Sequence, residues 1–176
     1  VDVDRLRKAN IWALSHYSVE SLYYHPAVIE RIAEKQAQLT GSDATVLKTQ
    51  SMAKGVADAS KKRDHLVSSS LMRTVRKELL GSLPNREQID ANAPVKIEVD
   101  VSALRKVEEA RFDSLVSSAD WDGLLARYPL RESSAFDRVI DGLLIKDRLT
   151  YKNVVLKMLQ DDGTALDEVR GLMGDL

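Results

Sequence analysis

The sequence contains no cysteine, which excludes disulfide bonds and thiolate metal ligands and is compatible with the cytoplasmic location that we expect. No apolar run approaches the roughly 20 residues that a membrane span requires, so we expect no membrane partner. The sequence also lacks a Gly-rich phosphate-binding loop and a Gly-x-Ser-x-Gly motif. These absences argue against P-loop nucleotide binding and serine-hydrolase chemistry.

Charge is unevenly distributed, although the formal net charge of the 176 residues is only -1. The stretch from Lys48 to Lys77 is strongly basic, whereas the last segment is acidic. A basic stretch can hold the phosphates of a nucleic acid, and a solvated helix face is the alternative interpretation. The candidate nucleic-acid-binding residues are Lys48, Lys54, Lys61, Lys62 and Arg63.

Acidic residues near the beginning of the sequence form a candidate metal site. Asp2 and Asp4 alternate with valines, which places both carboxylates on one face of an expected strand end. The apolar run from residue 9 to 14 suits a buried strand, and Glu20 follows it. Carboxylates that converge there could bind Mg²⁺ or Mn²⁺. Alternatively, the aspartates are solvated terminal residues, and Ser18 is a helix N-cap with a nearby acid favoured by the helix dipole.

Two short motifs, Asp2-Val3-Asp4 and Ser18-Val19-Glu20, occur in the order found in a known family. The sequence resembles the OLD-like nucleases with a Toprim catalytic domain, especially relatives that accompany an ATPase in bacterial anti-phage defence. The resemblance implies metal-dependent phosphodiester cleavage, with DNA rather than RNA as the expected substrate. It also implies that Asp2, Asp4 and Glu20 bind the metal, while Ser18 positions a ligand or a phosphate oxygen. A further catalytic glutamate would have to precede Val1.

The predicted fold class is α/β, a Toprim-like remnant of a few strands, followed by a mainly α-helical C-terminal subdomain. We expect residues 1–101 to form the partial Toprim-like region with inserted helices, and residues 102–176 to form the helical subdomain. The clearest strand pattern is the alternation of apolar and charged residues over Val95–Val101. A helix is expected after Pro26 and should end at Gly41. Another is expected over Val56–Leu80, with a break near Gly55 or the serines at 68–70.

The second half of the sequence shows several helix-start patterns. Asp120 is placed to cap a short helix. At two later helix starts, Ser134 precedes Asp137 by three residues and Thr164 precedes Asp167 by three, an approximate capping box. The expected helices are Ser102–Val116, Trp121–Arg127, Ala135–Ile145, Thr150–Leu159 and Leu166–Met173.

A function from a different class remains open. The chain could be a non-catalytic interaction or regulatory module that docks against an ATPase domain or subunit, or against another copy of itself. Apolar residues exposed on the helices between Leu124 and Ile145 would favour this function. A plain helical adaptor without any site is a third alternative.

Overall fold

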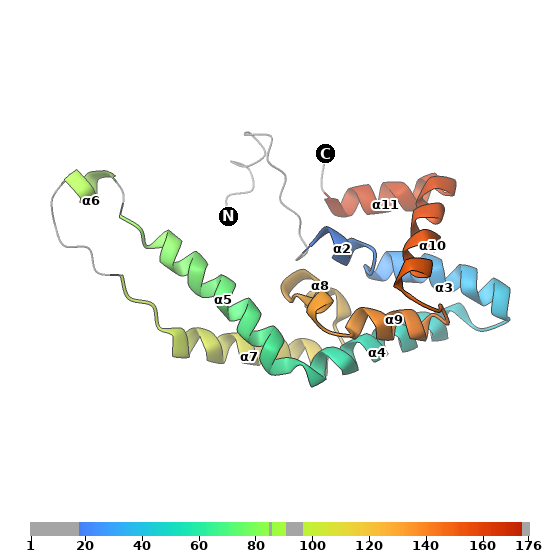
Figure 1. The fold of residues 1–176 in the computed structure, drawn as a ribbon, viewed down its shortest axis with the longest axis horizontal. Coiled ribbons are helices and arrows are strands. Elements are labelled where there is room, and N and C mark those ends of the chain that lie inside the picture. The colour runs from blue at the N-terminus through green and yellow to red at the C-terminus, as the bar shows by residue number, and fades with distance from the viewer. Residues whose placement is uncertain (1–17, 85, 91–96, 174–176) are drawn as a thin grey trace.

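The computed structural model describes residues 18–84, 86–90 and 97–173, and every regular element within these ranges is a helix (Figure 1). The predicted α/β fold class is therefore wrong. Residues 97–100 form no strand, and Val101 begins a helix because the Asp100 carboxylate accepts a hydrogen bond from the Ala103 amide at 2.9 Å. The alternation there finds no partner strand in the described chain. The strands expected before residue 15 lie outside the described residues.

The elements follow one another with short connections, apart from the segment between α6 and α7. None of the described helices has both the length and the apolar character that a bilayer crossing demands. In order, the elements are α2 (Val19–Leu22), α3 (Pro26–Thr40), α4 (Ala44–Lys61), α5 (Arg63–Gly81), α6 (Arg86–Asp90), α7 (Val101–Ser117), α8 (Trp121–Arg127), the 3-10 turn η1 (Leu130–Glu132), α9 (Ala135–Gly142), α10 (Arg148–Asp161) and α11 (Gly163–Met173).

Helix α3 forms for the reasons that its sequence suggests. Pro26 occupies the first turn, where its missing N–H is not needed. Gly41 ends the helix in the left-handed conformation with φ of 73°, and its N–H donates to the Ala37 carbonyl at 2.8 Å. The predicted helix and its end at Gly41 are both confirmed. Its apolar stripe faces the core through Val28, Ile29, Ile32 and Ala33.

The break between α4 and α5 falls at Lys62, which is not where the sequence suggested it. Gly55 lies inside α4, and a Cβ added to it would come within 2.7 Å of the Trp121 ring. The glycine therefore serves close packing against α8 and does not bend the helix. Residues 68–70 continue α5, with Ser70 buried.

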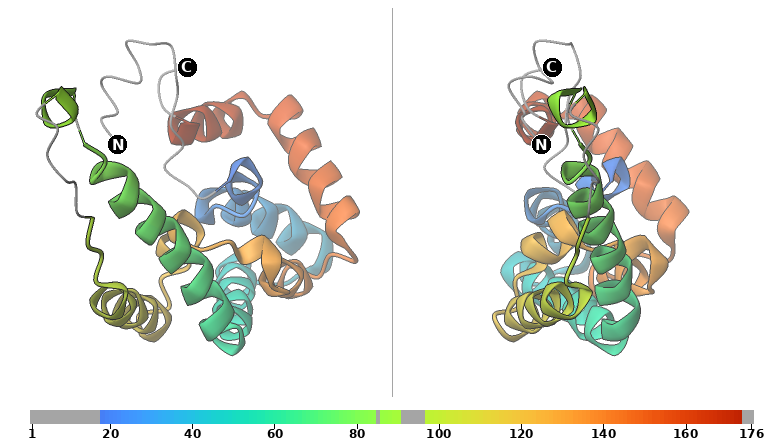
Figure 2. Two further views of the ribbon diagram at one scale, coloured as in Figure 1. Left: turned by 60° about the vertical axis from the view of Figure 1, so that its left-hand side comes forward. Right: turned by 90° about the vertical axis from the view of Figure 1, so that its left-hand side faces the viewer.

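The core lies among α3, α4, α8, α9 and α10, and α4 packs along α9 (Figures 1 and 2). Tyr24 stacks on Phe136 with ring centroids 3.9 Å apart, and on its other neighbour Tyr151 at 5.0 Å. Two backbone carbonyls beside this core are also satisfied: Trp121 Nε1 donates to the Tyr24 carbonyl at 2.8 Å, and the Tyr151 hydroxyl donates to the Tyr23 carbonyl at 2.7 Å. This core joins residues from both sides of the predicted boundary at 101/102.

One part of the molecule projects from this body. We call residues 72–107 the arm; it contains the second half of α5, the short α6 and the first half of α7. Figures 1 and 2 show α5 and α7 together near the body, with α6 at the far end of the arm. A projecting arm has less of the core to cover its side chains than the body has.

Candidate functional site

The Ser18-Val19-Glu20 motif lies at the beginning of α2. The Ser18 hydroxyl accepts a hydrogen bond from the Ser21 amide at 3.3 Å, so the N-cap role considered for Ser18 is confirmed. Glu20 occupies the first turn, where the helix dipole favours a negative charge. Ser18 thus has a structural role that requires no metal.

Glu20 lines a pocket of about 320 Å³ together with Tyr23, Tyr24, Arg148, Tyr151 and Lys152. The charged neighbours in this lining are cations, which favour an anion rather than a metal ion. Arg148 is held by the Asp137 carboxylate at 2.6 and 2.9 Å, and this hydrogen bonding raises the pKa of Arg148.

The metal site predicted from the sequence is not assembled in the described residues. Asp2 and Asp4 lie outside them. Within residues 18–84, 86–90 and 97–173, no group of three or more His, Asp or Glu side chains is placed to hold a metal ion. Of the predicted donor set, the structure describes Glu20 alone, so a Mg²⁺ or Mn²⁺ site stays a prediction.

The predicted nucleic-acid-binding residues are spread along α4 and the start of α5. Lys48 pairs with Glu30, with Nζ 2.7 Å from the carboxylate. Arg63 makes two hydrogen bonds of 2.7 Å to Asp113 on α7, which lower the pKa of that carboxyl. Two of the five cations are therefore engaged within the molecule. The other three, Lys54, Lys61 and Lys62, are exposed.

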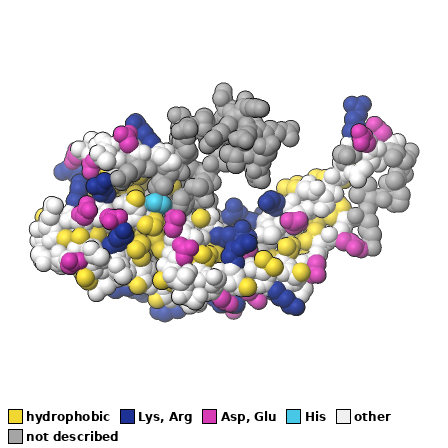
Figure 3. Space-filling model, turned by 180° about the vertical axis from the view of Figure 1, so that it is seen from behind, with side chains coloured by type: hydrophobic (Ala, Val, Ile, Leu, Met, Phe, Trp, Pro, Cys, Tyr) yellow, Lys and Arg dark blue, Asp and Glu magenta, His cyan; other side chains and the backbone are white. Residues whose placement is uncertain are grey.

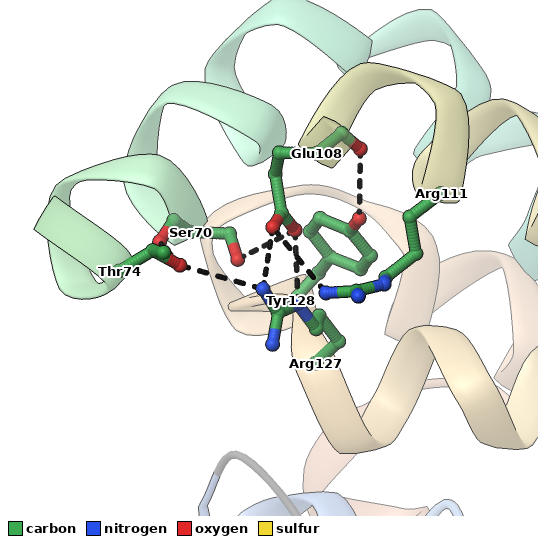
Figure 4. A network of polar contacts seen from close by, with 6 residues as sticks. All are labelled: Ser70, Thr74, Glu108, Arg111, Arg127 and Tyr128. Carbon is green, nitrogen blue, oxygen red and sulfur yellow. Dashed lines mark hydrogen bonds and ion pairs between the residues drawn. The ribbon is translucent and has the colours of Figure 1, made fainter. Parts of the chain in front are cut away.

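A buried polar network lies where α5, α7 and α8 meet (Figure 4). Glu108 is only 2% exposed, and its carboxylate accepts hydrogen bonds from Nε and one terminal nitrogen of Arg127. Ser70 Oγ donates to the same carboxylate at 2.8 Å, and Arg111 lies 3.7 Å from it. The Tyr128 hydroxyl donates to the Glu108 carbonyl at 3.4 Å.

The pKa of Glu108 is the net result of opposing effects. Burial would raise it, but the hydrogen bonds from Arg127 and Ser70, together with the nearby Tyr128, outweigh burial and lower it to about 2. The same contact raises the pKa of Arg127. The pair is therefore charged throughout the physiological range. Because it joins α5, α7 and α8 at the root of the arm, its first role is structural.

The arm carries most of the exposed apolar surface of the described chain. Eight of the thirteen exposed large hydrophobic side chains lie on it, with Leu80 at 69% and Ile89 at 60% exposure. Figure 3 shows hydrophobic side chains, in yellow, along the projecting part. A groove of about 240 Å³ lies between α5 and α7 on the arm, and both apolar and acidic residues line it. The apolar residues are Val99, Ala103, Leu104 and Val107, and the acidic residues are Glu78, Glu98 and Asp100.

The chain matches no family model, no curated protein and no solved structure. Its function therefore has to be argued from its own geometry.

The sequence contains a signal for the buried network. Glu108 lies four residues after Leu104 and four before Phe112, so it shares one face of the helix with these two apolar residues. An acid in the middle of an apolar stripe indicates a buried partner. The apolar neighbour Val107 is in contrast 56% exposed.

Proposed function

We propose that the chain is a helical interaction module whose arm binds a basic, amphipathic helix of a partner protein. The observation that carries this proposal is the groove between α5 and α7, which combines apolar side chains with carboxylates. The location of exposed apolar surface differs from the one expected. Leu124, Leu125, Ile140 and Leu143 are buried, and Leu144 alone of the large apolar residues in that region is strongly exposed, at 58%.

The chemistry of the groove defines the kind of partner. An amphipathic helix binds such a groove through apolar side chains spaced along one of its faces. The three carboxylates of Glu78, Glu98 and Asp100 favour Lys or Arg on either side of that apolar face, and they disfavour an acidic helix. A surface helix of an ATPase domain or subunit, the partner expected from the sequence resemblance, can supply this chemistry. A cytoplasmic setting belongs to the same proposal.

Reversing the charge of the groove tests the proposal. We expect Glu78→Lys combined with Glu98→Lys to weaken binding of a designed Leu/Lys amphipathic helical peptide by at least about tenfold at low salt, because attraction becomes repulsion. Fluorescence anisotropy of the labelled peptide measures this change. Asp100 is left intact because it caps α7.

Two controls make the result specific. Glu34→Lys combined with Asp161→Lys changes the net charge equally at exposed sites on α3 and α10, and should preserve peptide binding. A Leu/Glu peptide should bind much more weakly than the Leu/Lys peptide. Equal loss of peptide binding in both double variants would show a general charge effect and would contradict the proposal. Self-association through the arm, seen by sedimentation, would show that a second copy of the chain occupies the groove instead.

The metal-dependent nuclease predicted from the sequence is a second proposal, favoured by one observation. Glu20 shares its pocket with Arg148 and Lys152, cations that can contact a phosphate oxygen. If this function is correct, Asp4→Ala and Glu20→Ala in the full-length protein should each abolish Mg²⁺- or Mn²⁺-dependent cleavage of DNA or RNA, measured by gel electrophoresis. Unchanged cleavage in both variants would rule out their catalytic role.

A further inference from the structure

A further pocket lies at the root of the arm, between α5 and α8. It has a volume of about 290 Å³ and is lined by Ser70, Arg73, Thr74, Lys77, Ala126 and Arg127. We call these residues the basic pocket. Three of its six lining side chains are cationic and none is acidic. Figure 3 shows Lys and Arg side chains gathered in the hollow where the arm meets the body.

Helix geometry concentrates the charges of the basic pocket. Arg73 and Lys77 are four residues apart on α5, so they lie on the same face of that helix, and Arg127 approaches from the end of α8. Two like charges at this spacing destabilise a helix slightly. The arrangement becomes favourable when an anion lies between them.

The Glu108 network fixes the inner wall of this pocket. Nε and one terminal nitrogen of Arg127 are bound to Glu108, and that terminal nitrogen also donates to the Thr74 hydroxyl at 3.4 Å. Figure 4 shows the other terminal nitrogen pointing away from the carboxylate, and no described group accepts its protons. Arg127 is therefore held in place with donors to spare, as a preorganised anion site requires.

The acid of the neighbouring network is already matched by cations. Glu108 is matched by Arg127 and has Arg111 at 3.7 Å as well. Within the described part of the chain, no acidic side chain forms an ion pair with Lys77. A phosphate group carries a charge of about -1.5 to -2 at neutral pH, so it is attracted to the cations of this lining more strongly than a singly charged carboxylate is.

We propose that the basic pocket binds the terminal phosphate group of a small molecule. Inorganic phosphate and a nucleoside monophosphate present the same group, and the described lining has no aromatic side chain on which a base could stack. The phosphate alone therefore determines affinity. The Ser70 and Thr74 hydroxyls already donate to Glu108 and to the Ser70 carbonyl, so Arg73, Lys77 and Arg127 carry the recognition.

Calorimetric titration of the full chain tests this assignment. Inorganic phosphate and adenosine monophosphate should bind with similar affinity, and adenosine should not bind. Arg73→Ala combined with Lys77→Ala should weaken both affinities at least about tenfold, because charged hydrogen bonds are lost. Arg127 is not replaced, since its loss would leave buried Glu108 without its main partner. Adenosine monophosphate binding far more tightly than phosphate would identify a nucleotide as the source.

The matched control is Lys54→Ala combined with Lys61→Ala, which removes two exposed charges from α4 and should leave phosphate affinity unchanged. Equal weakening in both double variants, or no binding of phosphate by the unsubstituted chain, would overturn the proposal. A single-stranded oligonucleotide that bound a hundredfold more tightly through Arg73 and Lys77 would also overturn it in favour of a polynucleotide. Unchanged thermal unfolding of both double variants would show that folding is intact.

Discussion

Glu108→Gln is expected to lower the free energy of unfolding by roughly 3 kcal/mol, because it removes the counter-charge of Arg127 while keeping the shape of the side chain. Breaking a buried ion pair costs this much when one charge is left without its partner. The Arg127 side chain is 34% exposed, so water compensates part of the loss and keeps the effect at the lower end of the usual range. Urea unfolding followed by circular dichroism measures the difference.

The neighbouring residue provides the control. Glu109 is paired with Arg105 at 4.0 Å on the helix surface, with a side chain that is 34% exposed. Glu109→Gln should change stability by less than about 0.5 kcal/mol. If the two variants were equally stable, the network in Figure 4 would not hold the arm to the body as described.

The same carboxylate gives stability a defined dependence on pH. The pKa of Glu108 falls from an ordinary value of 4.5 to about 2 on folding. Its contribution, on the order of 3 kcal/mol, is fully present above pH 4.5 and is lost as the pH falls toward 2. The stability difference between the unsubstituted chain and Glu108→Gln should therefore shrink over this interval. A constant difference would contradict the proposed charge state.

Gly142→Ala should have a comparably large effect through packing alone. A Cβ at position 142 would lie 2.3 Å from the Cα of Ser51 and 3.0 Å from its backbone nitrogen. Backbone atoms cannot move aside as the end of a side chain can, so α4 and α9 would have to separate. We expect a loss of roughly 3 kcal/mol and a fall of about 10 °C in the unfolding midpoint, measured by calorimetry.

Gly81→Ala separates this effect from helix propensity. Gly81 ends α5, and no atom lies within 4 Å of a Cβ built on it. The substitution should leave stability unchanged or raise it by up to about 1 kcal/mol. Equal midpoints for the two alanine variants would show that α4 and α9 can adjust at no cost.

The local sequence pattern was enough to predict that the second half of the chain forms helices, but it did not always predict which residue caps each helix. Asp120 caps α8 through the Gly123 amide, as predicted. Ser134 makes no such bond at the start of α9, and Asp137 binds Arg148 instead. At α11 the capping side chain is Asp162, which accepts from the Ala165 amide, and not the expected Thr164. Several polar residues compete at each helix start, and tertiary contacts decide among them.

The strand prediction failed because alternation describes only one chain segment, whereas a strand needs a partner. Val95–Val101 alternates well, but Asp100 provides a strong helix start immediately before an apolar helical pattern. The functional surfaces are similarly non-local. The groove unites α5 with the residues before and within α7, and the basic pocket unites α5 with α8. The spacing of residues along one segment could not have predicted either surface. The position of Glu108 on an apolar stripe, however, does indicate a buried polar contact in the sequence itself.

The two bonds that fix the turn after α2 set an order for assembly. The carbonyls of Tyr23 and Tyr24 accept these hydrogen bonds from Tyr151 and Trp121, which lie 128 and 97 positions later in the chain. Closing such long loops is slow compared with forming the helices themselves. On the ribosome, the turn after α2 therefore stays without these two bonds until Tyr151 has left the exit tunnel, so its packing depends on residues that are synthesised well after it.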